Sequence, residues 1–184
     1  MHRRVGSGSP LMLVHGYLGG QFMWQFQEPL QDDFELIMPS LAGYGESAHL
    51  EAPSSIPGNV DDICRLLDYL EIDKVDLLGH SMGGMIVQEM AANRPERINR
   101  LICLGTGSMG VLPNRFEPIE ESRRKILNLG LEHARENIAR TWFLNPDFEA
   151  GLSLCQSEGA KATKQAALAS LEAWEHWDGR EQLS

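Results

Sequence analysis

Short apolar runs alternate, over the first part of the chain, with segments in which apolar residues recur every three or four positions. Uninterrupted apolar runs are typical of parallel strands covered on both faces, and the longer periodicity is typical of amphipathic helices. The pattern therefore predicts strands joined by helical crossovers. We expect strands at residues 11–14, 34–38, 75–78 and 101–104, and helices at 21–30, 60–70 and 85–93.

This alternation predicts an α/β protein with a doubly wound, mostly parallel sheet. After Gly110 the apolar runs vanish, and we expect amphipathic helices instead at residues 117–129, 132–142, 148–156 and 161–177. A helical insertion after a strand, rich in large apolar side chains, is typical of a cap that closes over a pocket. The alternative is an ordinary helical subdomain with an aromatic core. The expected division is a core at 1–112, a helical cap at 113–177 and a return to the core at 178–184.

Composition narrows the class of protein. The 184 residues are 42% hydrophobic and 23% charged, which is typical of one globular domain. A net charge of −10 argues against nucleic acid or an anionic membrane as partner, and the apolar runs are too short to cross a bilayer. Three cysteines lie far apart in apolar contexts (Cys64, Cys103 and Cys155), which favours buried thiols and a cytoplasmic location.

The clearest chemical signal is Gly79-His80-Ser81-Met82-Gly83, which follows a predicted strand and precedes a predicted helix. A serine on such a tight strand-to-helix turn has a strained backbone, and only small neighbours let the strand and helix pass. The helix begins directly after Ser81, so its first N–H groups point to where an oxyanion would form. Nucleophilic chemistry at Ser81 is the leading hypothesis, and a glycine-rich turn without chemistry is the alternative.

Four motifs occur in an order that resembles the α/β-hydrolase superfamily. They are His-Gly-Tyr at 15–17, Leu-Ala-Gly-Tyr-Gly-Glu-Ser at 41–47, Gly-His-Ser-Met-Gly-Gly at 79–84 and Pro-Glu-Arg at 95–97. The chain is similar to the serine branch with a helical cap, over residues 10–183. Within that branch it resembles enol-lactonases, carboxylesterases, C–C bond hydrolases and cofactor-free haloperoxidases.

The resemblance implies roles for individual residues. Ser81 would be the nucleophile, and the backbone N–H groups of Met82 and Tyr17 would bind the oxyanion. Four further residues are expected to shape or contact the substrate pocket, namely His15, Gly16, His80 and Trp142. The implied substrate is a small ester, lactone or related carbonyl compound, with no metal or organic cofactor. The oligomeric state is left open.

The chain also departs from the family pattern. In capped members the triad acid and histidine follow the cap, whereas this chain stops at a segment, 178–184, that resembles the cap's exit. Residues 3–9 look like the end of an earlier strand and its turn. We therefore expect a chain truncated at both ends, with an open sheet edge at residues 101–104 and little or no activity. His133, His176 and Asp178 lie on or beside predicted cap helices and are poor substitutes for the missing partners.

A smaller departure lies in the loop after the second predicted strand, where Ser40 replaces the usual aspartate.

Two functions remain open after these observations. The first is a serine hydrolase whose nucleophile is Ser81. The second is a noncatalytic module of the same fold that binds a small apolar ligand, or a partner chain at the open sheet edge.

Overall fold

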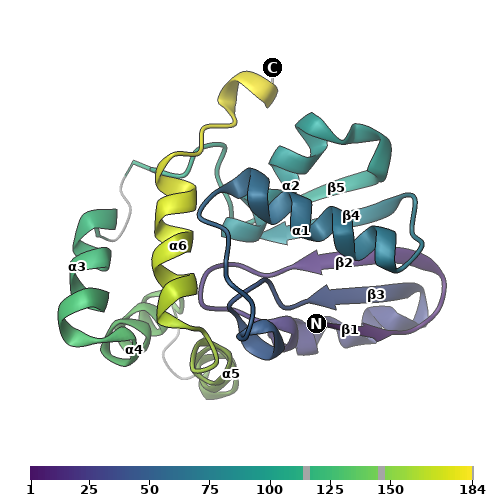
Figure 1. The fold of residues 1–184 in the computed structure, drawn as a ribbon. Coiled ribbons are helices and arrows are strands. Elements are labelled where there is room, and N and C mark those ends of the chain that lie inside the picture. The colour runs from purple at the N-terminus through teal and green to yellow at the C-terminus, as the bar shows by residue number, and fades with distance from the viewer. Residues whose placement is uncertain (114–116, 145–147, 184) are drawn as a thin grey trace.

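The computed structural model describes residues 1–113, 117–144 and 148–183. Residues 114–116 and 145–147, within the predicted cap, and residue 184, in the predicted final segment, lie outside the described residues. The chain forms a five-stranded sheet with the order β1-β3-β2-β4-β5 (Figure 1). The strands are β1 (His2–Val5), β2 (Ser9–Val14), β3 (Phe34–Pro39), β4 (Val75–His80) and β5 (Ile98–Leu104).

The sheet has the predicted mostly parallel topology. β2, β3, β4 and β5 pair in parallel with their neighbours, and β1 runs antiparallel to β3 at one edge. Each of the four predicted strands lies inside an observed one, and β1 accounts for the strand remnant expected near residue 3. Parallel neighbours need long crossovers, which the helices between them supply. The predicted α/β fold class is confirmed.

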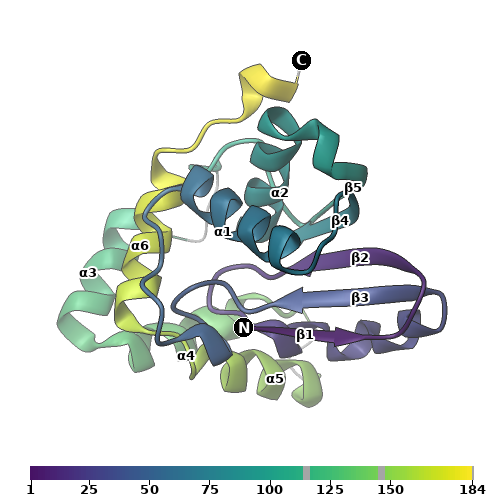
Figure 2. The same cartoon turned by 45° about the vertical axis from the view of Figure 1, so that its right-hand side comes forward.

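Helices cover both faces of the central strands (Figure 2). Along β2, Met12 and Val14 pack in the cluster that contains α1 (Ile56–Tyr69) and α2 (Met82–Asn93). Leu11 and Leu13 point to the opposite face, where Trp24 of η1 (Gln21–Asp32) covers them. This alternation is what a strand buried on both faces requires. The sheet thereby holds the carboxyl ends of β2 and β4 side by side.

β5 differs from the other parallel strands because most of its residues are exposed. Leu101, Ile102 and Leu104 are 37%, 44% and 49% exposed, although the strand is apolar in sequence. Among the described residues, β5 pairs with β4 alone. The open sheet edge expected from the sequence is therefore confirmed for this part of the chain.

Two of the predicted connecting helices differ from the observed ones. The first is a 3-10 helix, which contains Pro29, a residue without a backbone N–H to donate. The second, α1, begins at Ile56 rather than at residue 60. Its start is set by Ser55, whose side chain accepts a hydrogen bond from the Gly58 N–H.

In the described residues four α-helices follow β5, before the short 3-10 helix η4 (Arg180–Leu183), and we call these four the cap helices (Figure 1). Each overlaps one of the four helices predicted after residue 112, with ends that differ by a few residues. The division into 1–112, 113–177 and 178–184 stays a prediction of domain limits. The cap helices are α3 (Ile119–Leu129), α4 (Leu131–Thr141), α5 (Glu149–Gly159) and α6 (Lys164–Glu175).

The two ends of the cap lie side by side. Met109 and Asp178 form an isolated antiparallel bridge. The Gly110 N–H donates to the Trp177 carbonyl (3.0 Å), and the Gly179 N–H donates to the Ser108 carbonyl (2.9 Å). We call this pairing of 108–110 with 177–179 the neck. It joins the start and the end of the cap at one place on the core.

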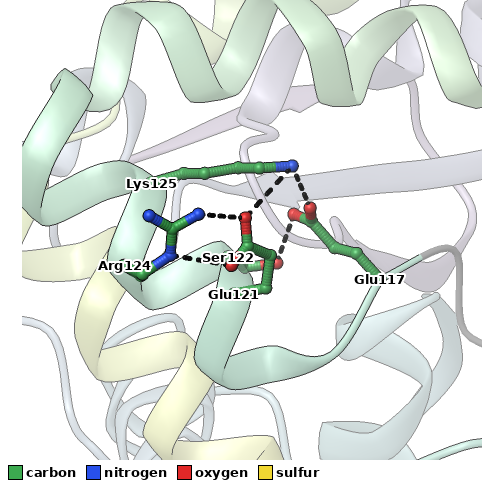
Figure 3. Close-up of polar contacts among 5 residues, drawn as sticks. All are labelled: Glu117, Glu121, Ser122, Arg124 and Lys125. Atoms are coloured by element: carbon green, nitrogen blue, oxygen red, sulfur yellow. Dashed lines mark hydrogen bonds and ion pairs between the residues drawn. The ribbon is translucent and has the colours of Figure 1, made fainter.

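A polar network fixes the start of α3 (Figure 3). The Ser122 hydroxyl donates to a Glu117 carboxylate oxygen (2.6 Å), and Lys125 pairs with the other oxygen. Arg124 binds both oxygens of Glu121 (2.7 and 2.8 Å). Ser122 is buried whereas Arg124 is exposed. The network therefore runs from the interior of the cap to its surface.

Among the residues that the structure describes, no helix combines the length and the apolar character that a membrane crossing needs. In the same residues, no group of three His, Cys, Asp or Glu side chains is placed to hold a metal ion. The cysteines are free thiols. Cys155 is buried as predicted, but the prediction is wrong for Cys103, which is exposed because it lies on β5 at the sheet edge.

Candidate active site

Ser81 occupies a sharp turn between β4 and α2. Its backbone has φ 54° and ψ −118°, a combination that is strained for a residue with a side chain. Two contacts, one from the last residue of β5 and one from the loop after it, hold the strained residue in place. The Ser81 N–H donates to the Leu104 carbonyl (3.0 Å), and the Thr106 hydroxyl donates to the Ser81 carbonyl (2.8 Å). The predicted strand-to-helix turn is confirmed, and α2 begins at Met82.

The glycines of the turn are required by close backbone approach. A Cβ atom on Gly79 would overlap the carbonyl oxygen of Gly83, and one on Gly83 would overlap that of Val14. A Cβ on Gly84 would overlap the side chain of Thr106. Since carbonyl oxygens belong to the packed backbone, these overlaps have no easy relief. The sequence prediction that only small residues fit around Ser81 is confirmed.

A second backbone segment runs beside Ser81. A Cβ on Gly16 would lie 3.0 Å from the Ser81 Cβ, so the loop that follows β2 contacts the turn at Ser81 directly. Residues 16–20, which we call the oxyanion loop, carry the predicted Tyr17 donor. The Gly19 N–H donates to the Gly16 carbonyl (3.2 Å), and Leu18 has a positive φ of 54°. Met82 is the first residue of α2, where N–H groups have no partner within the helix.

Two cavities meet at Ser81. The larger has a volume of about 380 Å³ and the smaller about 210 Å³, and Tyr17, Ser81 and Trp142 line both. The larger is also bordered by Gly16, Gly19, Met23, His80, Gly105, Phe143 and Cys155. The smaller is also bordered by Met85, Gly110, Leu112, Ile138 and Trp174. Three of the residues predicted to contact substrate, Gly16, His80 and Trp142, therefore lie on a cavity wall.

His15, which was expected to shape or contact the substrate pocket, borders neither cavity. Its ring is completely buried, with Nδ1–H donating to the Gly16 carbonyl (2.8 Å) and Nε2 accepting from the Leu41 N–H (3.0 Å). Burial lowers the pKa of His15 to about 4, against a smaller opposing effect of the Gly16 hydrogen bond. The buried ring thus links the Gly16 carbonyl of the oxyanion loop to the Leu41 N–H, and it supports the loop on the side away from the cavities.

His80 follows a different pattern. Its ring lines the larger cavity and stacks edge-on against Trp24 at 6.5 Å. Burial lowers the pKa of His80 below the ordinary value. The neutral ring therefore forms part of the pocket wall at neutral pH.

The side chains that the sequence offered as substitute triad partners lie elsewhere. His133 and His176 are exposed and border neither cavity, and Asp178 is exposed and bound to Arg180. Within the described residues, we find no hydrogen bond between the Ser81 hydroxyl and a histidine or a carboxylate. In the part of the chain that the structure describes, the Ser81 hydroxyl thus has no base bonded to it.

Several supporting residues were missed from the sequence. Gln88 donates from Nε2 to the carbonyls of Gly84 (2.9 Å) and Gly107 (3.0 Å), and so ties the loop after β5 to α2. The available signal for Gln88 was a polar residue inside a mostly apolar helix. Thr106, which bonds to the Ser81 carbonyl, carries no signal in the sequence, because a threonine in a glycine-rich loop has no distinguishing pattern. Ser40 accepts a weak hydrogen bond from the Gln21 N–H (3.4 Å) beneath the oxyanion loop.

Comparisons with known proteins agree with this geometry. A family model described as the alpha/beta hydrolase fold matches residues 9–140. The chain is 30% identical over 189 residues to a putative carbamate hydrolase from Azorhizobium caulinodans, covering 97% of this chain and 69% of that protein. It is 35% identical over 112 residues to a 2-hydroxymuconate semialdehyde hydrolase from a Pseudomonas species, covering 56% of this chain and 38% of that protein.

Solved structures show the same fold at lower identity. The enol-lactonase from Burkholderia xenovorans superposes with a TM-score of 0.88 and 22% identity, covering 99% of this chain and 72% of that one. A thermophilic esterase from Thermogutta terrifontis superposes with a TM-score of 0.85 and 23% identity, covering 100% of this chain and 69% of that one. The chain spans less than half the length of several curated relatives, including 28% of an acetyltransferase component from Pseudomonas putida. From the family match and the shared architecture, this chain belongs to the α/β-hydrolase fold family.

Proposed function

We propose that the protein is a serine hydrolase that acts on a small carboxylic ester, lactone or related carbonyl compound by nucleophilic attack of Ser81. The observation that carries the proposal is the strained Ser81 at the start of α2, at the junction of two cavities. Strained backbone of this kind persists where the surrounding contacts enforce it, and it gathers at catalytic positions. The names of the relatives, which include hydrolases, an esterase and an enol-lactonase, support the same reaction class.

The proposed reaction begins with a bond between Ser81 Oγ and the substrate carbonyl carbon. The π electrons of the carbonyl move to its oxygen, and the hydroxyl proton passes to a base. The N–H groups of Met82 and Tyr17 are the proposed donors to the resulting oxyanion, each supplying about 3 kcal/mol of transition-state stabilisation. Collapse expels the leaving group and leaves an acyl-serine, which water hydrolyses. In this proposal the chain supplies Ser81 as the nucleophile, the N–H groups of Met82 and Tyr17 as oxyanion donors, and the pocket.

The two cavities indicate the shape of the substrate. The smaller one, at about 210 Å³, is bordered mainly by apolar side chains and lies below the range of about 300–1,000 Å³ that holds drug-sized ligands. We assign it to one compact apolar group of the substrate. The larger cavity, bordered by both polar and aromatic groups such as His80 and Phe143, accommodates the other part. Trp142 and Ser81 stand at the boundary, where the carbonyl would lie.

The free thiols, the acidic composition and the pocket at Ser81 support the remaining parts of the proposal. We place the protein in the cytoplasm because unpaired cysteines persist in reducing compartments. We assign it a small-molecule substrate, with neither nucleic acid nor membrane as partner.

One observation favours the second candidate, a noncatalytic binding module. The Ser81 hydroxyl lacks a bonded base among the described residues, and without a base a serine is a weak nucleophile at neutral pH. The exposed apolar residues of β5 offer such a module a surface for a partner chain.

A fluorophosphonate probe separates the two candidates, because it reacts covalently with activated serines. The hydrolase proposal expects labelling at Ser81, located by mass spectrometry, and its loss in Ser81→Ala. Ser153→Ala is the matched control, since Ser153 is an exposed serine on α5 and its removal is expected to leave labelling unchanged. A folded chain that binds small apolar ligands but resists the probe at millimolar concentration would favour the binding module.

A further inference from the structure

The carboxyl-terminal end of cap helix α5 packs against the oxyanion loop. Glu158 is buried there, with a side chain only 2% exposed, and its Oε2 accepts a hydrogen bond from the Phe22 N–H (3.2 Å). A Cβ on Gly20 would overlap that same carboxylate oxygen. A Cβ on Gly159 would lie 3.4 Å from the Leu18 carbonyl oxygen. Two consecutive residues of α5 therefore meet the backbone of residues 18–22.

The contact between α5 and residues 18–22 includes charged groups as well as van der Waals packing. Lys161 lies 2.7 Å from Glu158 Oε1 and 3.9 Å from Glu46 Oε1 of the core, and its ammonium lies 4.8 Å from the Phe22 ring centre. A buried carboxylate is costly unless it is paired and hydrogen-bonded, and an apolar side chain would pack at this seam without that cost. Charge at such a position can fix one particular register between two elements, and here those elements are α5 and the segment after the oxyanion loop.

The same helix also borders the substrate cavity. Cys155 lies one turn before Glu158 on α5 and lines the larger cavity beside Ser81. α5 thus contacts the cavity with one residue and the backbone next to the oxyanion loop with another. A shift of the helix would be felt at both places, because packed interiors transmit displacement.

We propose that Glu158 is a positioning residue, which reaches from the cap to fix the oxyanion loop so that the Tyr17 N–H faces the Ser81 site only when α5 is docked. The catalytic part of this inference rests on the proposed hydrolase function, whereas the mechanical coupling does not. Glu158 acts through the backbone of residues 18–22 and has no contact with the reacting atoms.

The first test is amide hydrogen exchange, measured on the full 184-residue chain. Glu158→Ala removes the acceptor of the Phe22 N–H and is expected to speed exchange at Phe22 by about tenfold or more, because an unbonded amide loses local protection. Glu158→Gln keeps an oxygen acceptor but removes the charge, and is expected to give a smaller increase. Glu149→Gln, which makes the same charge change at the exposed start of α5, is the matched control and is expected to change nothing.

Amides of α2 and β4 serve as the internal reference. If Glu158 only supported global stability, their exchange would rise in step with that of Phe22. A selective change at residues 18–22 supports coupling. Unchanged protection of Phe22 in both Glu158 variants, or a uniform change throughout the chain, would overturn the proposal. Since Glu158→Gln preserves the shape of the side chain, it decides the matter if Glu158→Ala does not fold.

The second test follows the rate at which the fluorophosphonate labels Ser81. Misplacing one oxyanion donor slows the chemical step more than it weakens encounter with the probe. Glu158→Ala is therefore expected to lower the maximal labelling rate about tenfold with little change in the half-saturating probe concentration. Equal maximal rates would overturn the catalytic part. Absence of labelling in the unmodified chain would count against the hydrolase function instead, and the exchange measurement would still decide the coupling.

Discussion

The elbow at residues 79–84 and the cap helices meet around Ser81, but they are packed in different ways. At the elbow, Gly79 and Gly83 face backbone carbonyl oxygens at distances that leave no room for a side chain. In the cap, Gly151 faces the rings of Phe148 and Phe143, and Gly130 has open space beside it. Rings can rotate, whereas carbonyls of paired strands cannot move alone. The difference teaches that the position of Ser81 is fixed by backbone packing, while the pocket over it is shaped by side chains.

The first prediction tests this contrast with two glycine-to-alanine changes inside helices. Gly83→Ala places a methyl group against the Val14 carbonyl, and we expect a loss of more than about 4 kcal/mol in the free energy of unfolding. Gly151→Ala meets the half-exposed Phe148 ring and gains up to about 1 kcal/mol of helix propensity, so its net change should stay within about 1 kcal/mol. Urea denaturation measures both. Similar losses for the two variants would break the comparison.

The second prediction concerns the support of the oxyanion loop by His15. The pKa of His15 is about 4 in the folded chain and about 6.5 when unfolded, so the unfolded chain binds more protons between these values. Stability is therefore expected to fall as the pH drops from 7 to 4.5, by about 2–3 kcal/mol from this group.

Urea denaturation at the two pH values measures the loss, with His15→Gln as control. The control should be less stable at pH 7 and should lose less on acidification. His80, whose pKa is also lowered by burial, adds to the slope in both proteins. An unchanged pH slope in His15→Gln would mean that this ring does not titrate as its burial implies.

The third prediction moves to the neck between the core and the cap. Trp177 donates from Nε1 to the Glu89 carboxylate (2.8 Å), and both side chains are buried. Trp177→Phe leaves one carboxylate oxygen without this donor, and we expect a loss of about 1–3 kcal/mol. Denaturation followed by tryptophan fluorescence and by circular dichroism measures it. If the fluorescence and circular dichroism transitions coincide, the cap helices and the core unfold together. If they are separate, the two regions unfold independently.

The smallest effect is expected at the surface of the cap. Arg124 binds both oxygens of Glu121 but is exposed to solvent, and such pairs contribute little (Figure 3). Arg124→Ala should leave the thermal midpoint unchanged within experimental error. Ser122→Ala removes a buried hydrogen bond to Glu117 in the same network and should lower the midpoint measurably. A larger effect of Arg124→Ala than of Ser122→Ala would contradict this ranking.

The sequence predicts the elbow well because local patterns determine it. An apolar run, a Gly-x-Ser-x-Gly motif and a following helix suffice to place Ser81 on a strained turn, and the backbone angles agree. The strands are predicted for the same reason, since burial on both faces leaves a continuous apolar run.

Contacts between distant segments were not predictable in this way. His15 was expected to shape or contact the pocket, but its place behind the oxyanion loop could not be predicted because it depends on the Leu41 N–H, 26 residues away. Glu158 meets Phe22 across 136 positions, and neither residue carries a local signal for the other. The 3-10 form of η1 was not predicted either, because the spacing of apolar residues over 21–30 does not distinguish it from an α-helix.

The neck has a consequence for how the protein can be altered. Because the chain leaves the sheet and returns to it through two short paired segments, 108–110 and 177–179, whatever lies between them can change length without stretching the strands. Insertions in loops of this kind cost little entropy when their ends are already held together. The helices between the two segments are therefore expected to tolerate exchange if the contact of Glu158 with residues 20–22 is kept, and grafting different helices there is a route to altered ligand preferences on an unchanged sheet.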